Sequence, residues 1–213
     1  MKELVVLVAD KDMEVVIKTL IEKRYNSLGI RKLSKEDFDI YVHPSHDPGV
    51  YKRAHEFLKP FINQYKFALV MFDHIGSGQE TNEVGDVEKK VKERLESSGW
   101  KERCEVVVIN PELEIWVWAK SPHVAKVLGL SGDKLDEILK GFEKDELGKP
   151  KFPKEAMNRC LRESKVPRSS AIYVELAEKV SLESCKDLSF KKIRDILRKW
   201  FKSDNFSKEG QFK

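Results

Sequence analysis

Four short apolar runs in the first half of the chain each end in a cluster of polar side chains. The runs cover residues 5–9, 38–42, 67–72 and 105–109. Continuous apolar runs of this length are typical of strands that are covered on both faces, as in a parallel sheet. Because the carboxyl ends of parallel strands share one edge, where open α/β sheets bind ligands, we expect the polar clusters to converge there.

Helical patterns separate the apolar runs. Apolar residues recur at helical spacing after the first run (Val15, Val16, Leu20, Ile21) and after the second (Tyr51, Ala54, Phe57, Leu58, Phe61). Asp12 is suitably placed to cap the first helix, and a charged helix is expected over residues 86–96. Strands that alternate with helices in this way indicate βαβ units and a mostly parallel, Rossmann-like α/β sheet.

The pattern changes after residue 118, where no further strand run appears. Short helices are predicted instead near residues 134–142, 154–163, 171–180 and 189–202. We therefore expect an α/β domain over residues 1–120, a helical carboxyl-terminal region over 121–202 that packs on it, and a flexible polar tail over 203–213.

Composition places the chain among globular proteins with a heavily charged surface. Of 213 residues, 40% are hydrophobic and 36% are charged, without an apolar stretch of membrane-spanning length or a signal-peptide pattern, so we expect a cytoplasmic protein that does not contact a membrane. Three widely spaced cysteines do not suggest a disulfide framework. Abundant Lys and Glu with little Gln is typical of thermophile proteins.

Charge is divided unevenly along the chain. Residues 1–120 hold 19 basic and 21 acidic side chains, a net charge of −2, whereas residues 121–213 hold 21 and 15, a net charge of +6. An acidic half beside a basic half suits a metal site next to a surface that binds a polyanion such as nucleic acid. An ordinary solvated surface with uneven charge explains the same numbers.

Two aspartates carry the strongest chemical signal. Asp10 and Asp73 each follow a predicted buried strand directly, at the edge where ligands bind. Carboxylates held in such a place bind Mg²⁺ or Mn²⁺, which take oxygen ligands and keep water or substrate phosphate in their shell. The alternative is that each aspartate caps the helix or turn that follows it.

The segment Asn110-Pro111-Glu112-Leu113-Glu114-Ile115-Trp116 gives a second signal, because its acids interrupt an apolar stretch just after the fourth strand. We expect Glu114 to point into the site and to complete the metal shell. Both acids would otherwise be first-turn residues favoured by a helix dipole.

Three of the five histidines, His43, His46 and His74, are predicted at the same edge. Histidine can ligate a transition metal or move a proton, although a loop histidine is more often structural. The Gly76-Ser77-Gly78 loop lets the backbone approach a ligand but lacks the spacing of a Walker loop. The last predicted helix has a basic face that either contacts phosphates or is simply solvated (Lys191, Lys192, Arg194, Arg198, Lys199, Lys202).

These motifs, in this order, resemble a Toprim-like group that includes RloB-like proteins and proteins of methylation-associated phage-defence systems. The resemblance covers most of the chain and is most specific in residues 110–116, and Ser189-Phe190 is similar to a carboxyl-terminal Ser-Phe motif of that group. It implies a Toprim-like fold, with a glutamate after the first strand as general acid/base and an Asp-x-Asp after a later strand that holds Mg²⁺. Here those positions are Ala9-Asp10, with Glu14 one turn later, and Asp73-His74-Ile75, so the second acid is missing and Glu114 or Glu80 would have to compensate.

The preferred hypothesis is metal-dependent phosphodiester hydrolysis on nucleic acid by a nuclease-like component of a defence system. Asp10, Asp73 and Glu114 would bind the metal, and Glu114 would also orient the attacking water. Glu14 or His74 would act as general acid/base. The first alternative is a catalytically degenerate module that binds nucleic acid or nucleotide and partner proteins of the defence system. The second is a small-molecule zinc hydrolase that uses His43 and His46.

Overall fold

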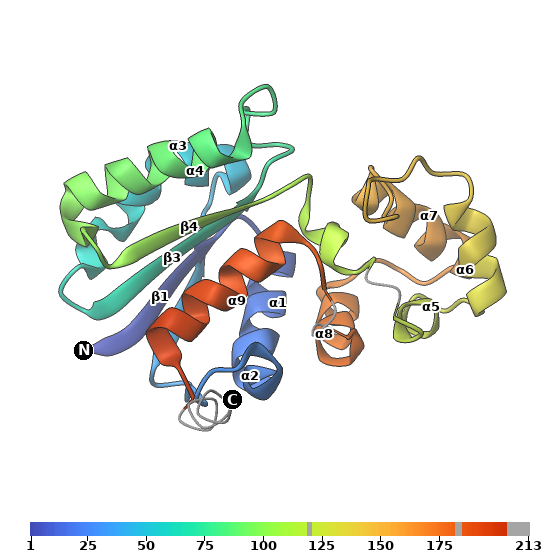
Figure 1. Cartoon of the computed structure of the whole chain (residues 1–213), viewed down its shortest axis with the longest axis horizontal. Helices are drawn as coiled ribbons and strands as arrows, with labels where there is room; N and C mark the ends of the chain where they lie inside the picture. The colour runs from blue at the N-terminus through green and yellow to red at the C-terminus, as the bar shows by residue number, and fades with distance from the viewer. Residues whose placement is uncertain (119–120, 182–184, 204–213) are drawn as a thin grey trace, which may run out of the picture.

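A four-stranded parallel sheet forms the centre of the protein (Figure 1). The computed structural model describes residues 1–118, 121–181 and 185–203. The strands are β1 (Lys2–Val8), β2 (Phe38–Val42), β3 (Tyr65–Asp73) and β4 (Cys104–Ile109), in the order β2-β1-β3-β4. All three strand pairs are parallel, so the α/β prediction with a parallel sheet is confirmed.

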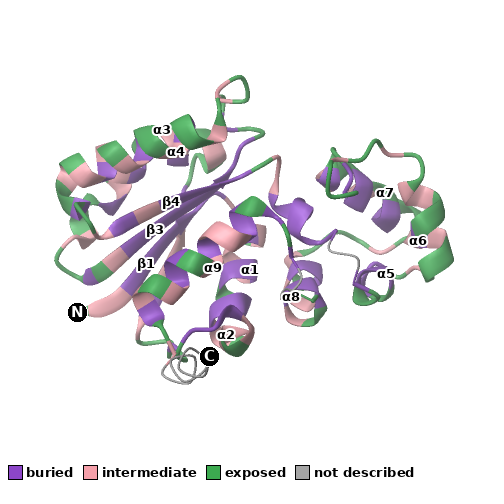
Figure 2. Ribbon diagram, viewed as in Figure 1, coloured by how far each residue is buried: buried purple, intermediate pink, exposed green. Residues whose placement is uncertain are grey.

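Helices cover both faces of the sheet, because successive strand residues point to opposite sides and both sides are apolar. Val6, Leu69 and Val107 face one layer, which contains α1 (Lys11–Lys23), α2 (Tyr25–Leu28) and α9 (Leu188–Phe201). Val5, Val70 and Val106 face the other layer, which contains α3 (His46–Leu58), η1 (Lys59–Phe61), α4 (Val84–Leu95) and η2 (Glu96–Trp100). Figure 2 shows the buried strands between these layers.

The helical region after β4 extends the first of these apolar layers. It comprises η3 (Leu113–Trp116), α5 (His123–Val127), α6 (Gly132–Leu139), α7 (Pro153–Ser164) and α8 (Ser170–Lys179) before α9. Helix α8 packs on α1, whereas α5, α6 and α7 lie to one side of the sheet (Figure 1). The four predicted helices of this region are present, and α5 is an additional short helix that the apolar spacing did not indicate.

The prediction that Asp12 caps α1 is wrong, and the alternative that Asp10 caps it is confirmed. Asp10, not Asp12, is the N-cap, with extended backbone angles (φ −148, ψ 177) and a side chain that accepts from the Met13 N–H at 2.8 Å. Because β1 ends at Val8, the chain turns into the helix two residues earlier than the Asp12 prediction requires. Asp12 therefore lies in the first helical turn and is available for contacts with α8.

The remaining predictions concern the carboxyl-terminal tail and the relation of the chain to a membrane. Apart from residue 203, the expected tail lies outside the described residues. Within the described part of the chain, no helix is long and apolar enough to cross a membrane.

Candidate active site at the carboxyl edge of the sheet

The carboxyl ends of the strands bring the predicted polar residues to one edge of the sheet. His43 donates its N–H to the Val8 carbonyl at 2.9 Å, and His74 donates its N–H to the Ile109 carbonyl at 2.8 Å. Asp73 is paired with Ile109 in the β3–β4 register. Backbone hydrogen bonds therefore hold the residues that follow the four strands together along one edge of the sheet.

Asp73 is the most deeply placed acid at this edge, with only 4% of its surface exposed. Its Oδ1 accepts from the Leu113 N–H at 3.0 Å, and its own N–H donates to Asp47 Oδ1 at 2.8 Å. Burial raises the pKa of Asp73 well above its usual value, and the negative charges of Asp47, Glu114 and Asp10 raise it further. We call Asp10, Asp47, Asp73 and Glu114 the acidic cluster.

Glu114 is the second buried acid, with 1% of its surface exposed. Its Oε1 accepts hydrogen bonds from the Tyr173 hydroxyl at 2.6 Å and from Arg168 Nη2 at 3.0 Å. Its Oε2 is buried and has no hydrogen-bond partner among the described residues. Leaving a carboxylate oxygen without a donor is costly in the interior, so this atom is placed to accept from a water or ligand at the cluster.

The ionised form of Asp47, like that of Asp73, is disfavoured by its surroundings. Burial raises the pKa of Asp47, the nearby Asp10 charge raises it further, and Lys154 opposes both effects. Its segment enters α3 from β2, so the acidic cluster receives carboxylates from four separate parts of the chain. Repulsion among these carboxylates opposes folding, and carboxylates held together in this way are typical of sites that bind a cation.

Two basic side chains from the helical region face the acidic cluster. Burial alone lowers the pKa of Lys154, but the charges of Glu114, Glu112 and Asp73 outweigh it and raise this pKa. Lys154 Nζ lies 3.6 Å from Glu112 Oε1. Arg168 contacts Asp12 Oδ2 at 3.3 Å in addition to Glu114. The site thus contains both carboxylates and basic side chains.

Glu14 and His74, the predicted acid/base residues, are engaged away from Asp73. Glu14 lies on α1 and pairs with Lys11 at 2.7 Å. His74 is buried, and its Nε2 lies 3.0 Å from the Gln79 carbonyl oxygen. Neither side chain is among the charges that shift the pKa of Asp73.

The other two histidines at this edge also have structural contacts. His43 is buried, its Nδ1 accepts from the Ser45 N–H at 3.1 Å, and burial lowers the pKa of its ring. His46 Nδ1 lies 3.2 Å from the Ala9 carbonyl oxygen. These contacts use one ring nitrogen of each and give no support to the zinc alternative.

The backbone of the glycine loop after β3 donates hydrogen bonds to a carboxylate side chain of the same loop region. The N–H groups of Gly76 and Gly78 donate to Glu80 Oε1 at 2.8 and 3.1 Å. These and its own backbone hydrogen bond lower the pKa of Glu80. Glu80 thus accepts the hydrogen bonds that the loop N–H groups donate. This contact explains the position of Glu80 without a role in the acidic cluster.

The two motifs that carry the family resemblance contact each other. Trp116 Nε1 donates to Ser189 Oγ at 2.8 Å, and its ring meets Phe190 edge-on with centroids 5.3 Å apart. Asp187 caps α9 and lies 3.6 Å from Nζ of the buried Lys149. These residues attach α9 to the segment that carries Glu114.

A metal ion fits this site only if water and substrate complete its shell. No group of three His, Cys, Asp or Glu side chains with metal-binding geometry is found in the described part of the chain. Mg²⁺ is commonly held by one or two carboxylates together with waters and substrate phosphates, and the carboxylates available here are Asp73 and the acids whose charges act on it. The unpartnered Glu114 Oε2 is consistent with an ordered water there.

Several site residues escaped the sequence analysis. Arg168, Tyr173 and Lys154 lie in the helical region and were given no role, because a lone residue on a helix or loop carries no local signal. Asp47 follows the second apolar run directly after His46 but was given no role either. The spacing of Lys154, Asn158 and Arg162, each four residues apart, is a signal in the sequence that could have drawn attention to this region.

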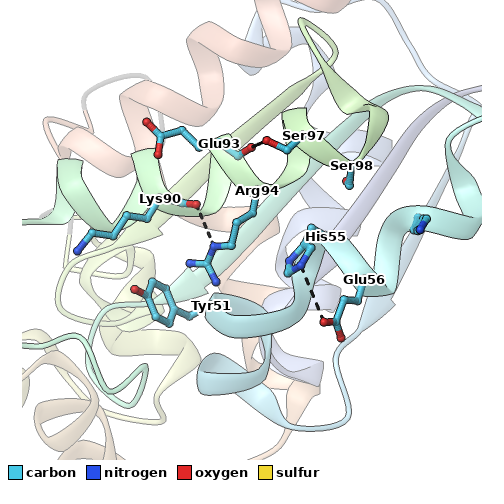
Figure 3. A pocket seen from close by; sticks show the side chains of 9 residues that line it. Tyr51, His55, Glu56, Lys90, Glu93, Arg94, Ser97 and Ser98 are labelled. Atoms are coloured by element: carbon cyan, nitrogen blue, oxygen red, sulfur yellow. Dashed lines mark hydrogen bonds and ion pairs between the residues drawn. The ribbon is translucent and has the colours of Figure 1, made fainter.

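A wide surface hollow lies elsewhere. It has a volume of about 810 Å³ between α3 and α4 and is lined by residues such as Tyr51, Lys90 and Arg94 (Figure 3). None of its lining residues belongs to the acidic cluster, and it combines basic with acidic side chains, including Glu56 and Glu93. The volume of a hollow therefore does not by itself identify the candidate active site.

Comparisons with protein-family models, with curated proteins and with solved structures give no significant match to this chain.

Proposed function

We propose that this protein hydrolyses phosphodiester bonds of nucleic acid with Mg²⁺ or Mn²⁺, as a nuclease-like component of a cytoplasmic defence system. The observation that carries the proposal is the position of Asp73. It is buried at the end of a central strand, and three further carboxylates raise its pKa. A bound divalent cation would relieve this repulsion, which has no structural benefit of its own.

Asp73 and Asp10 are the proposed holders of the ion, with Asp47 beside them. Such an ion supplies charge stabilisation at the scissile phosphate and a hydroxide near neutral pH. Asp10 also caps α1, so its position is fixed by the Met13 N–H before any ion binds. The cap and the metal role, which the sequence left as alternatives, are compatible with each other.

Lys154 and Arg168 are the proposed contacts to the substrate phosphate. Both lie beside the carboxylates, and Glu114 with Tyr173 fixes the orientation of the Arg168 guanidinium. Glu114 is thus a positioning residue in this proposal, while Glu14 and His74 are given no step because both are engaged elsewhere. Arg and Lys in this arrangement stabilise charge that develops on a phosphoryl group.

A degenerate binding module is the second candidate. It is favoured by Ile75, which stands where the Toprim pattern has its second metal-binding acid, and by the lack of a three-residue metal group among the described residues. In that case the same edge would bind nucleotide or nucleic acid and dock other defence proteins without cleavage.

The substitution Asp73→Asn separates the two candidates. With a labelled oligonucleotide and Mg²⁺ or Mn²⁺, the hydrolase proposal expects cleavage by the unmodified protein and at least a hundredfold loss with Asp73→Asn. Asp86→Asn, on the exposed start of α4, is the matched control and should cleave normally. Absence of cleavage by the unmodified protein with either metal supports the binding module.

Calorimetric titration with Mg²⁺ tests the metal site independently of cleavage. The unmodified protein should bind the ion, and Asp73→Asn should lose that binding. Equal binding by both proteins would remove Asp73 from the site.

A further inference from the structure

We infer that one face of α7 and the groove at its end form a binding track for the phosphate backbone of a single nucleic-acid strand that leads into the acidic cluster. This inference rests on the proposed function and extends it. It assigns the surface that selects a polymer rather than a free nucleotide as substrate.

The first observation is a polar stripe on α7. Lys154, Asn158 and Arg162 are four residues apart and therefore share one face of the helix. Lys154 begins the stripe beside Glu112 and the acidic cluster. From Lys154 to Arg162 the helix rises about 12 Å, which corresponds to roughly three or four nucleotides of a stacked strand.

The second observation is a groove that continues the stripe. It has a volume of about 400 Å³ and is lined by four polar or basic residues, Asn158, Arg162, Lys165 and Arg168, and by three apolar ones, Leu161, Val166 and Pro167. Three of its lining residues are basic and none is acidic. A groove lined by both basic and apolar side chains matches surfaces that follow a single-stranded backbone.

Arg168 joins the groove to the acidic cluster. Its Nη1 donates to Asn158 Oδ1 at 3.1 Å, and its Nη2 donates to Glu114 Oε1 at 3.0 Å. A strand in the groove would therefore pass the guanidinium that faces the proposed metal site. The track and the chemistry share this side chain.

Local charge favours this surface over two others. Residues 149–168 hold seven basic and two acidic side chains, a net charge of +5. The hollow between α3 and α4 has mixed charge. On α9, Lys192 pairs with Glu88 at 2.7 Å, and Arg198 donates to the Leu28 carbonyl at 2.7 Å, so part of its basic face is already neutralised or engaged.

Arg162 and Lys165 also lie at the end of α7, where basic residues complement the helix dipole. That ordinary role affects helix stability but confers no affinity for a polyanion. A binding measurement therefore distinguishes the two explanations.

The test compares the double variant Arg162→Gln/Lys165→Gln with the control Lys89→Gln/Lys90→Gln on the exposed face of α4. Both remove two positive charges, and Gln preserves helix propensity. Affinity for a short fluorescein-labelled single-stranded oligonucleotide is measured by anisotropy at several salt concentrations in EDTA, which prevents cleavage.

The track variant should bind severalfold more weakly, and its slope of log affinity against log salt should fall by about 1.4, as expected for two lost phosphate contacts. The control should match the unmodified protein. Thermal unfolding of both variants verifies that they are folded.

An unchanged salt slope in a folded track variant would overturn the inference, as would an equal loss in the control. Competition by unlabelled polyglutamate that equals competition by unlabelled oligonucleotide would also overturn it, because the groove would then recognise an acidic polypeptide. Track-dependent binding without any cleavage in Mg²⁺ supports the track and refutes only the hydrolase.

Discussion

Arg168 Nη2 lies 3.0 Å from Glu114 Oε1, so a side chain between α7 and α8 contacts a carboxylate 54 residues earlier in the chain. Glu114 is almost completely buried and receives both of its described hydrogen bonds, from Arg168 and Tyr173, from this later region. The helical region is therefore part of the site and not an appendage to the sheet.

Removal of the Tyr173 hydroxyl should destabilise the protein. Tyr173→Phe deprives the buried Glu114 Oε1 of one of its two donors, and we expect a loss of about 1–3 kcal/mol in the free energy of unfolding, measured in urea. Tyr25→Phe is the control, because its hydroxyl has no hydrogen bond within the described residues, and it should change this free energy by less than about 0.5 kcal/mol. Equal effects would show that the Glu114 contact is not stabilising.

Asp73→Asn should stabilise the metal-free protein at neutral pH. The pKa of Asp73 is raised in the folded state, so its ionised form opposes folding increasingly as pH rises above about 4, the value in an unfolded chain. Asn keeps an Oδ1 acceptor for the Leu113 N–H and carries no charge. The unfolding temperature in EDTA should exceed that of the unmodified protein at pH 7 and converge with it near pH 4.

Asp39→Asn provides a control of opposite sign. Burial opposes ionisation of Asp39, but hydrogen bonds from Lys2 and Tyr65 outweigh it and lower its pKa. This variant should lose stability at pH 7, with the loss disappearing as pH falls below about 4. If both variants shift the unfolding temperature in the same direction, the charge argument is wrong.

Gly49→Ala should be destabilising even though the position lies in a helix. A Cβ atom there would lie 2.3 Å from His43 Nδ1, so the buried ring would have to move. Gly85→Ala in α4 meets open space and should instead stabilise the protein by about 0.5–1 kcal/mol, as is usual for this change in a helix. Unfolding in urea of the two variants should give changes of opposite sign.

Lys149→Met should cost roughly 3 kcal/mol, because it leaves the buried Asp187 without its cation and the Ile115 carbonyl without its donor. Lys151→Met, two residues away, removes an exposed lysine that pairs with Glu143 and should change stability by less than about 0.5 kcal/mol. Calorimetric unfolding of both variants measures the difference. A small effect at Lys149 would mean that this ion pair contributes little.

The sheet could be predicted from the sequence because a strand buried on both faces needs a continuous apolar run, and runs such as residues 67–72 have no other simple explanation. The edge that collects Asp10 and Asp73 follows from the common direction of the strands. The cap of α1 was placed two residues too late, because both Asp10 and Asp12 are good capping residues and spacing alone does not distinguish them.

The partners of Glu114 could not be predicted. Arg168 and Tyr173 reach it through the way α8 packs on α1, a tertiary arrangement that no local pattern encodes. The same holds for Lys154, which is one basic residue among many until α7 is placed beside η3. The ends of the strands indicate from the sequence where a site lies, whereas the helices that complete the site are identified only by the structure.

The return of α9 to the sheet sets an order for assembly of the protein. Trp200 stacks on Phe67 with ring centroids 4.7 Å apart, and Phe201 meets the same ring edge-on. During synthesis all four strands therefore leave the ribosome before the helix that seals one of their faces. A truncated polypeptide that stops short of Leu188 would leave that aromatic surface uncovered and prone to aggregate.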